Sequence, residues 1–241
     1  MSDPSPSTNE LVESLKVQAE TLFQASQIEA GDSPDERDEF TRQQLRRASE
    51  LVKGAAALGA IENSACLGIL SRSLLEQLIT SLWGIRSIEN AESQMGAGSA
   101  ELAKALKMNL KAGTARIFDR DTGEDVTAKF LESEHAKQTR RRKNVEDQAR
   151  EADVQDLYTV FYRLLSLETH GHSETPAEKS KISALCLIHL QGIGAISRGI
   201  GQACVWWLMH RSWPDNESLR DVLGLNSKPQ KSADSRSTGR Q

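Results

Sequence analysis

The stretch SACLGILSRSLLEQLITSLWGIRSIEN, residues 64–90, decides the fold of this chain. Its apolar side chains recur at helical spacing, and its first two turns, residues 65–70, are apolar on every side. A helix on the surface of a bundle keeps a broad polar face, so an all-round apolar beginning is typical of a buried helix. We therefore predict a central helix over residues 64–90, with other helices packed around it.

Capping boxes predict three further long helices, because each places a side-chain acceptor three residues before an acidic residue. The boxes are Ser7-Thr8-Asn9-Glu10, Ser33-Pro34-Asp35-Glu36 and Thr175-Pro176-Ala177-Glu178. The first helix has an apolar face and stops near Gly31. The second has proline at its first helical position and runs to about residue 58. The third is a long apolar helix that reaches Trp206 and Trp207.

The middle of the chain predicts shorter elements. In chain order they are a loop over residues 92–100, a helix with Leu102, Leu106 and Leu110, a turn at residues 120–123, a charged stretch over 127–152, and an amphipathic helix that Asp153 caps and that ends near His170. Strand signals are nearly absent. We predict an all-α fold, a multi-helix up-and-down bundle with long helices. Residues 9–225 form its single domain, between disordered residues 1–8 and 226–241.

Charge and cysteine content exclude several classes of protein. The formal net charge of −4 argues against a protein that coats nucleic acid, although it is compatible with a local basic patch. Cys66, Cys186 and Cys204 are too far apart for a zinc knuckle or a redox pair, so we expect free thiols in a reducing, cytoplasmic environment. The N-terminus lacks the pattern of a signal peptide. Polar side chains interrupt the apolar residues 182–209, which favours a buried helix over a membrane span.

One predicted helix face carries chemically capable side chains. Tyr158, Tyr162, Ser166 and His170 follow one another at intervals of four residues, and Arg163 falls on the same side. We expect the opposite side to be buried; it carries Leu157, Val160, Phe161, Leu164 and Leu165. Two interpretations stay open. The polar face is either the solvated side of an amphipathic helix or a functional site.

Arg72 and Glu76 lie four residues apart on the polar flank of the central helix. Arginine before glutamate is the weaker orientation for a local pair on a helix surface. Because their neighbours are apolar, we expect the two charges to be partly buried and to need partners from another helix. One interpretation is a structural ion pair that fixes helix packing. The sharper hypothesis is a contact with Tyr162, Ser166 or His170.

These residues resemble a bacterial family called domain of unknown function 5677. The resemblance rests on Arg72-Ser-Leu-Leu-Glu76, on the four-residue spacing from Tyr158 to His170, and on the segment FDRDTGEDVT, residues 118–127. It covers roughly residues 51–172. It implies an all-α fold and no established activity. The polar cluster it implies consists of Arg72, Glu76, Tyr158, Tyr162, Ser166 and His170.

A second resemblance implies a mechanism. Arg163 and His170 match the Arg-x4–6-His pattern of the HEPN superfamily, helical proteins that include metal-independent ribonucleases of toxin and phage-defence systems. In that superfamily, dimerisation brings two such pairs together at a groove. The resemblance implies that Arg163 binds the scissile phosphate as a bidentate cation. It implies that His170 acts in general acid–base transfer, with the RNA 2′-hydroxyl as the nucleophile.

Other patterns have plainer interpretations. Glu168, His170, His172 and Glu174 offer metal-ligand types, but no second cluster completes a site, so we expect neither a metal nor a cofactor. The basic run at residues 140–143 is interpreted as a solvated helix face, because acidic residues follow closely. Glycines near residues 192–201 favour close approach of a neighbouring helix or a second protomer. Trp206, Trp207 and Trp213 then anchor a dimer or pack in the core.

Two functions from different classes follow. The specific hypothesis is a HEPN-like, metal-independent ribonuclease in phage defence or a toxin system, with RNA as substrate, a homodimer as its form and no membrane partner. The alternative is a non-catalytic helical interaction or scaffold protein whose polar cluster is structural or binds a partner. The first predicts that RNA cleavage requires His170. The second predicts that changing His170 alters only stability or partner binding.

Overall fold

The structure is a computed structural model that describes residues 6–29, 33–112, 114–133, 143–162, 165 and 179–211, without the side chains of residues 99–103, 110, 111, 131 and 179–181. Within these ranges the elements are helices, apart from one isolated β-bridge between Phe118 and Asp125. They are α1 (Thr8–Ala25), α2 (Glu36–Ala60), α3 (Ser64–Ile85), α4 (Ile88–Lys111), α5 (Thr127–Glu132), α7 (Val145–Glu151), α8 (Gln155–Leu157), the π-helix η1 (Tyr158–Tyr162) and α10 (Lys179–His210). The predicted all-α fold is confirmed.

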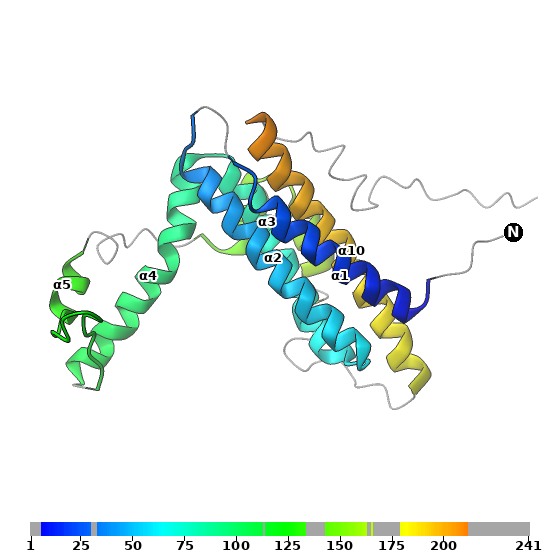
Figure 1. Cartoon of the computed structure of the whole chain (residues 1–241), viewed down its shortest axis with the longest axis horizontal. Coiled ribbons are helices and arrows are strands. Elements are labelled where there is room, and N and C mark those ends of the chain that lie inside the picture. Colours follow the sequence, from blue (N-terminus) through cyan, green and yellow to red (C-terminus); the bar gives the residue numbers. More distant parts are fainter. Residues whose placement is uncertain are drawn as a thin grey trace, which may run out of the picture.

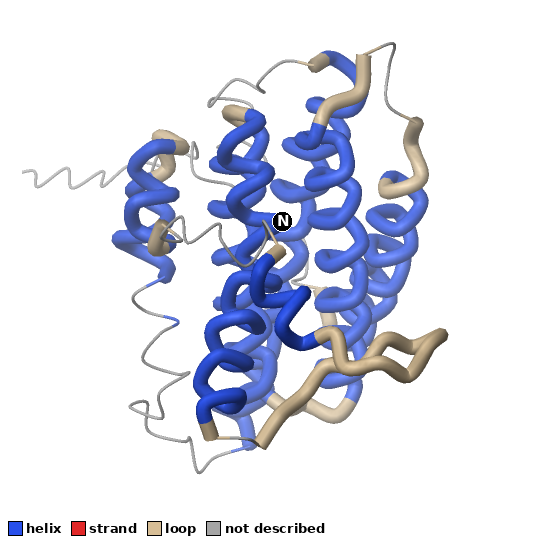
Figure 2. Tube along the Cα trace, turned by 90° about the vertical axis from the view of Figure 1, so that its left-hand side faces the viewer, coloured by secondary structure: helices blue, strands red, loops and turns tan. Residues whose placement is uncertain are grey.

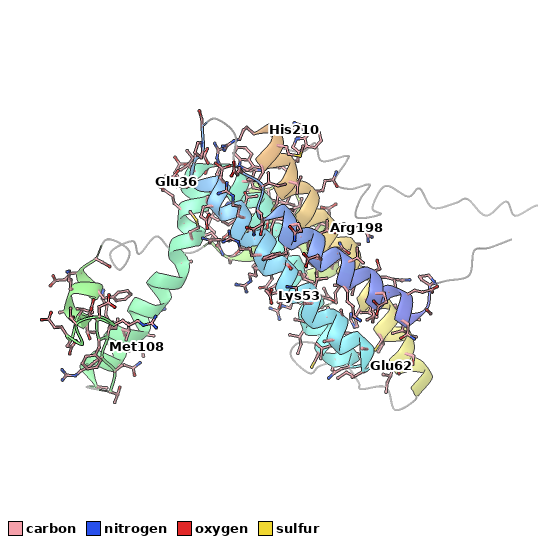
Figure 3. The ribbon with its side chains drawn as sticks, in the orientation of Figure 1. Glu36, Lys53, Glu62, Met108, Arg198 and His210 are labelled. Carbon is pink, nitrogen blue, oxygen red and sulfur yellow. The ribbon has the colours of Figure 1, made fainter. Side chains whose placement is uncertain are left out.

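Four long helices, α1, α2, α3 and α10, pack side by side as a bundle (Figures 1 and 2). Helix α4 starts at the end of α3 and projects away from the bundle, and α5 packs against it (Figure 1). We call residues 88–133 the arm. Met108 on the arm accordingly lies far from Lys53 and Arg198 in the bundle (Figure 3). Helix α7 and η1 pack on α3, with α8 between them in the chain.

Contacts between the helices fix their directions. Ser49 of α2 donates to the Ala19 carbonyl of α1, and Arg42 donates to that of Ile28, so α1 and α2 are antiparallel. Helix α3 is antiparallel to α2, because Gln77 donates to the Gln44 carbonyl at 2.6 Å while the later Gly84 lies against Phe40. These three helices alternate up and down as predicted. After the arm and residues 143–162, helix α10 runs parallel to α3.

The parallel orientation of α10 and α3 follows from two contacts. His189 lies 3.4 Å from Ser71, and Cys204 lies beside Ser81 further along both helices. The cysteines behave as free thiols, with Cys186 and Cys204 buried and Cys66 half-buried. Burial raises the pKa of Cys204 to about 12, because it disfavours the thiolate. Cys204 is therefore an inert core residue.

Helix α3 is the central helix, but its all-round buried part lies later than the sequence predicts. Every residue from Gln77 to Ile85 is buried. In the predicted stretch, Ala65 is exposed and Ile69 is 43% exposed. The reason is that residues 143–162 cover the second half of α3. The core therefore lies between α1, α2, α3 and α10, and residues 143–162 add a further layer over α3.

The described helix starts agree with the predicted capping boxes, with one shift. Ser7 caps α1 through the predicted box with Glu10. Helix α2 is capped by Asp35 and not by Ser33: the Asp38 carboxylate accepts from the Asp35 amide at 2.6 Å. Asp38 is buried and also binds Arg211, the residue after α10, at 2.6 Å, so a tertiary ion pair selects this box. Gly31 and the third box, at residues 175–178, lie outside the described residues.

Two predicted boundaries around the arm are wrong. Helix α3 ends at Ile85, and residues 92–100 are part of helix α4. Glycine costs roughly 1 kcal/mol in a helix, whereas the alanine, glutamate, glutamine and methionine residues around Gly96 and Gly98 are strong helix formers. The predicted turn at residues 120–123 is confirmed. Asp119 accepts from the amides of Asp121 and Thr122, and Gly123 has a φ of 72°.

Helix α10 is the long apolar helix that the sequence predicts. Residues Ile182–His210 are long and apolar enough to cross a membrane. The 18-residue window of this helix that meets the test has a mean hydropathy of 1.2, and 44% of the window is buried inside the protein. Gly201 allows Leu22 of α1 to approach closely, since an added Cβ would lie 3.1 Å from it. Trp207 is buried, whereas Trp206 is 40% exposed. Trp213 lies outside the described residues.

We predict that Gly84→Ala destabilises the bundle by about 1–3 kcal/mol, the usual cost of overpacking a core. The reason is that a Cβ at position 84 would overlap the ring atoms Cε1 and Cζ of Phe40, which is fully buried. Urea unfolding, followed by helical circular dichroism, measures the change.

Gly192→Ala in α10 is the matched control, because an added Cβ there has nothing within 4 Å. Helix propensity alone then stabilises the variant by up to about 1 kcal/mol. Equal stability of the Gly84 variant and the wild type would contradict the close packing of α3 on α2.

Candidate functional site

Arg72, Glu76 and Tyr162 form one hydrogen-bonded cluster between α3 and η1. The Tyr162 hydroxyl accepts from Arg72 Nη2 at 2.9 Å and donates to Glu76 Oε1 at 3.0 Å. Arg72 Nε lies 3.2 Å from the same carboxylate oxygen, and the guanidinium carbon lies 4.9 Å from the centre of the Tyr162 ring. The predicted contact between Arg72 and Tyr162 is confirmed. We call these three residues the triad.

The electrostatics of the triad keep Tyr162 protonated. Burial raises the pKa of its phenol, and the Glu76 carboxylate adds to this, while the hydrogen bond from Arg72 opposes it. For Arg72, burial lowers the pKa, but Tyr162 and Glu76 outweigh it and the net pKa is raised. At neutral pH Arg72 is therefore a cation and Tyr162 a neutral phenol. Tyr162 acts there as a hydrogen-bonded anchor and not as a general base.

The η1 segment presents the opposite face to the one the sequence predicts. Tyr158 and Tyr162 are half-buried and stack on each other, with ring centres 4.7 Å apart and planes 21° apart. Val160 and Phe161, which we expected to be buried, are 51% and 42% exposed. The π-helical turn rotates the segment relative to an α-helix, and the triad fixes its tyrosine side against α3.

The start of this segment also differs from the prediction. Asp153 does not cap a helix. It adopts a left-handed conformation with a φ of 55°, and α8 begins two residues later without a side-chain cap. The chain reverses direction at this residue, between α7 and α8. The predicted helix therefore begins two residues after Asp153, and its first turns are α8 and the π-helical η1 instead of a regular α-helix.

A second set of polar contacts, not predicted from the sequence, lies on the same side of α3. Thr80 donates to Gln148 Oε1 at 2.9 Å in a buried hydrogen bond, and Trp83 Nε1 donates to Glu151 at 2.7 Å. Arg86 donates to the Ala152 carbonyl at 2.9 Å. The sequence does contain a pattern that indicates these contacts. Positions 72, 76, 80, 83 and 86 are three or four residues apart, which places their side chains on one face of the helix.

Several predicted site residues cannot be placed. Arg163, Ser166 and His170 lie outside the described residues, and so do the metal-ligand types that we noted near His170, namely Glu168, His172 and Glu174. Among the described residues, no group of three or more histidine, cysteine, aspartate or glutamate side chains is arranged to hold a metal ion. The structure thus brings together Arg72, Glu76, Tyr158 and Tyr162, immediately before the position of Arg163.

The comparison with protein families identifies the chain. Residues 38–178 match the model described as "Family of unknown function (DUF5677)", and the chain belongs to this family. The match includes the triad and every residue on which the resemblance was based. No curated protein and no solved structure matches the chain. The HEPN resemblance stays a prediction.

We predict that Tyr162 ionises above the ordinary tyrosine pKa of 10. Glu76→Gln should lower its pKa, because a negative neighbour is lost, and Arg72→Met should raise it further. The two tyrosines of the chain are Tyr158 and Tyr162, so ultraviolet titration of the folded protein reports on this segment alone.

The raised pKa has a consequence for stability. It favours the folded state while the unfolded tyrosine is still protonated, and this contribution is lost as the pH rises from about 10 through the folded pKa. Wild-type unfolding free energy should therefore fall in that range more than that of Glu76→Gln. Ionisation of Tyr162 at or below its ordinary pKa would contradict the triad geometry.

Proposed function

We propose that this member of the DUF5677 family is a metal-independent ribonuclease whose Arg163–His170 pair is set in place by the triad. The observation that carries the proposal is the position of η1. This π-helix ends at Tyr162, which α3 holds through Arg72 and Glu76, and the next residue in the chain is Arg163. Single π-helical turns are rare and occur frequently at functional sites.

The chemistry follows from the two side chains. The 2′-hydroxyl of RNA attacks the adjacent phosphorus, the bond to the 5′-oxygen breaks, and a 2′,3′-cyclic phosphate and a 5′-hydroxyl result. His170 accepts the proton of the 2′-hydroxyl or donates one to the leaving oxygen. Arg163, permanently charged, binds the phosphate oxygens through its planar fork. A homodimer in the cytoplasm supplies two such pairs, in phage defence or in a toxin system.

Anchoring through Tyr162 is useful to such a reaction. Catalysis by positioned groups depends on holding them within a fraction of an ångström of the reacting atoms. A phenol that is fixed by a cation on one side and a carboxylate on the other restricts the backbone of the residue that follows it. The triad thus acts as a support for the catalytic pair and does not itself touch the RNA.

A second function is favoured by one observation. The Tyr162 hydroxyl uses its hydrogen as a donor to Glu76 and a lone pair as an acceptor from Arg72, so both of its hydrogen bonds are made within the triad. That arrangement also suits a non-catalytic interaction or scaffold protein in which the cluster only fixes helix packing. In such a protein, loss of His170 has no effect on RNA.

We expect purified protein to cleave total cellular RNA in the presence of EDTA, and His170→Ala and Arg163→Ala to abolish cleavage without unfolding. His210→Ala, at the exposed end of α10, is the matched control and should cleave like the wild type. Gel analysis of the RNA and circular dichroism of each variant provide the readouts.

Intact RNA in every lane at high protein concentration would reject the ribonuclease and favour the scaffold. Cleavage that persists in His170→Ala would reject the assigned catalytic pair. Tyr162→Phe keeps the ring stack but removes the hydroxyl, and its cleavage rate should fall below that of the wild type while its fold is retained.

A further inference from the structure

The segment from Ala152 to Tyr162 is attached to α3 at both of its ends. At the later end, Tyr162 is held by Arg72 and Glu76. At the earlier end, Arg86 Nη2 donates to the Ala152 carbonyl at 2.9 Å and lies 2.9 Å from the Asp153 carboxylate. Arg86 is the C-terminal cap residue of α3. One helix therefore holds both ends of the segment that leads to Arg163.

The earlier attachment lies where the chain changes direction. Asp153 has a φ of 55°, a left-handed conformation that non-glycine residues adopt only when their surroundings favour it. Aspartate tolerates this conformation better than most residues. Ala152 beside it is fully buried. The Arg86 guanidinium thus binds the carbonyl before the strained residue and the side chain of that residue itself.

The segment between the two attachments is short. Along α3, the rise from position 76 to position 86 is ~15 Å at 1.5 Å per residue. The helical residues of the segment, 155–162, span at most ~10 Å by the same measure, and the non-helical residues 153 and 154 join them to Ala152. Because the segment is short and is bound to α3 at both ends, a shift at one end is transmitted to the other. Leu157, in its middle, is buried and fixes the side that faces the bundle.

We infer that Arg86 is a positioning residue for the candidate site: by fixing the reversal at Ala152 and Asp153, it sets the placement of Tyr162 from the far end of the segment. The inference rests on the proposed function for its catalytic consequence, although its structural content does not require the protein to be a ribonuclease. Arg86 acts through the backbone of residues 152–162.

The two tyrosines allow a direct test on the full chain. Protein with ¹³C-labelled tyrosine gives ring signals from Tyr158 and Tyr162 alone, both within η1. Arg86→Met keeps the length of the side chain but removes its hydrogen bonds, and it should shift or broaden the Tyr162 signals. Arg150→Met is the matched control on α7, because Arg150 is 62% exposed and its ion pairs among the described residues are with Glu146 and Asp147 of its own helix.

Unchanged tyrosine signals in folded Arg86→Met would overturn the inference, whatever the activity of the protein. If Arg86→Met proves unfolded, Asp153→Asn tests the same attachment more mildly, since asparagine also tolerates the left-handed conformation but lacks the charge that Arg86 binds. A shift of the Tyr162 signals in that variant supports the inference, and unchanged signals overturn it.

The activity readout separates the two proposals. If the wild type cleaves RNA, Arg86→Met should lower the maximal rate by roughly ten- to a hundredfold with little change in KM, because misplaced catalytic groups lose rate and not ground-state binding. Arg150→Met should match the wild type. Absence of cleavage in the wild type rejects the ribonuclease alone, and the tyrosine signals still decide whether Arg86 positions Tyr162.

Discussion

Helix α3 is buried over its whole second half, and this constraint organises the rest of the molecule. A buried polar group without a hydrogen-bond partner costs free energy, so the buried polar side chains of α3 need partners, either within α3 or on an adjacent element. Gln77 finds a partner on α2, and Thr80 finds one on α7. Ser81 is satisfied within α3 itself, by the Gln77 carbonyl. The arrangement of neighbouring helices is therefore specified by polar contacts as well as by apolar packing.

The candidate site is part of this same pattern. Arg72, Glu76, Trp83 and Arg86 lie on the flank of α3 that faces residues 143–162, and each contacts a polar group in that layer. The layer also buries Ala149, Ala152 and Leu157, so apolar burial attaches it and the polar contacts define its register. Because α7 and η1 both pack on α3, that helix holds the layer as one unit. The conformation of η1, including its π-helical turn, depends on that support.

Sequence reasoning succeeded where a local rule decides the structure. The capping box at Ser7, the turn before Gly123 and the helical periodicity around α3 each depend on residues that are close in the chain. It failed where a distant residue decides. The cap of α2 moved to Asp35 because Arg211 holds Asp38, and the faces of η1 were reversed because α3 binds its tyrosines. The spacing of Arg72 and Glu76 among apolar neighbours predicted that both side chains need hydrogen-bond partners from another helix. That this partner is Tyr162 follows only from the tertiary structure.

By itself the sequence determined that the chain is helical, which helix is central, and which side chains would require a partner. These are properties of periodicity, capping and charge, and they act over a few residues. The tertiary structure decided that α10 runs parallel to α3, that the arm projects from the bundle, and that Tyr162 meets Arg72 and Glu76. Such contacts join residues about ninety positions apart, and no local preference encodes them. They form because burial on α3 leaves charged and hydroxyl groups that only a neighbouring element can satisfy.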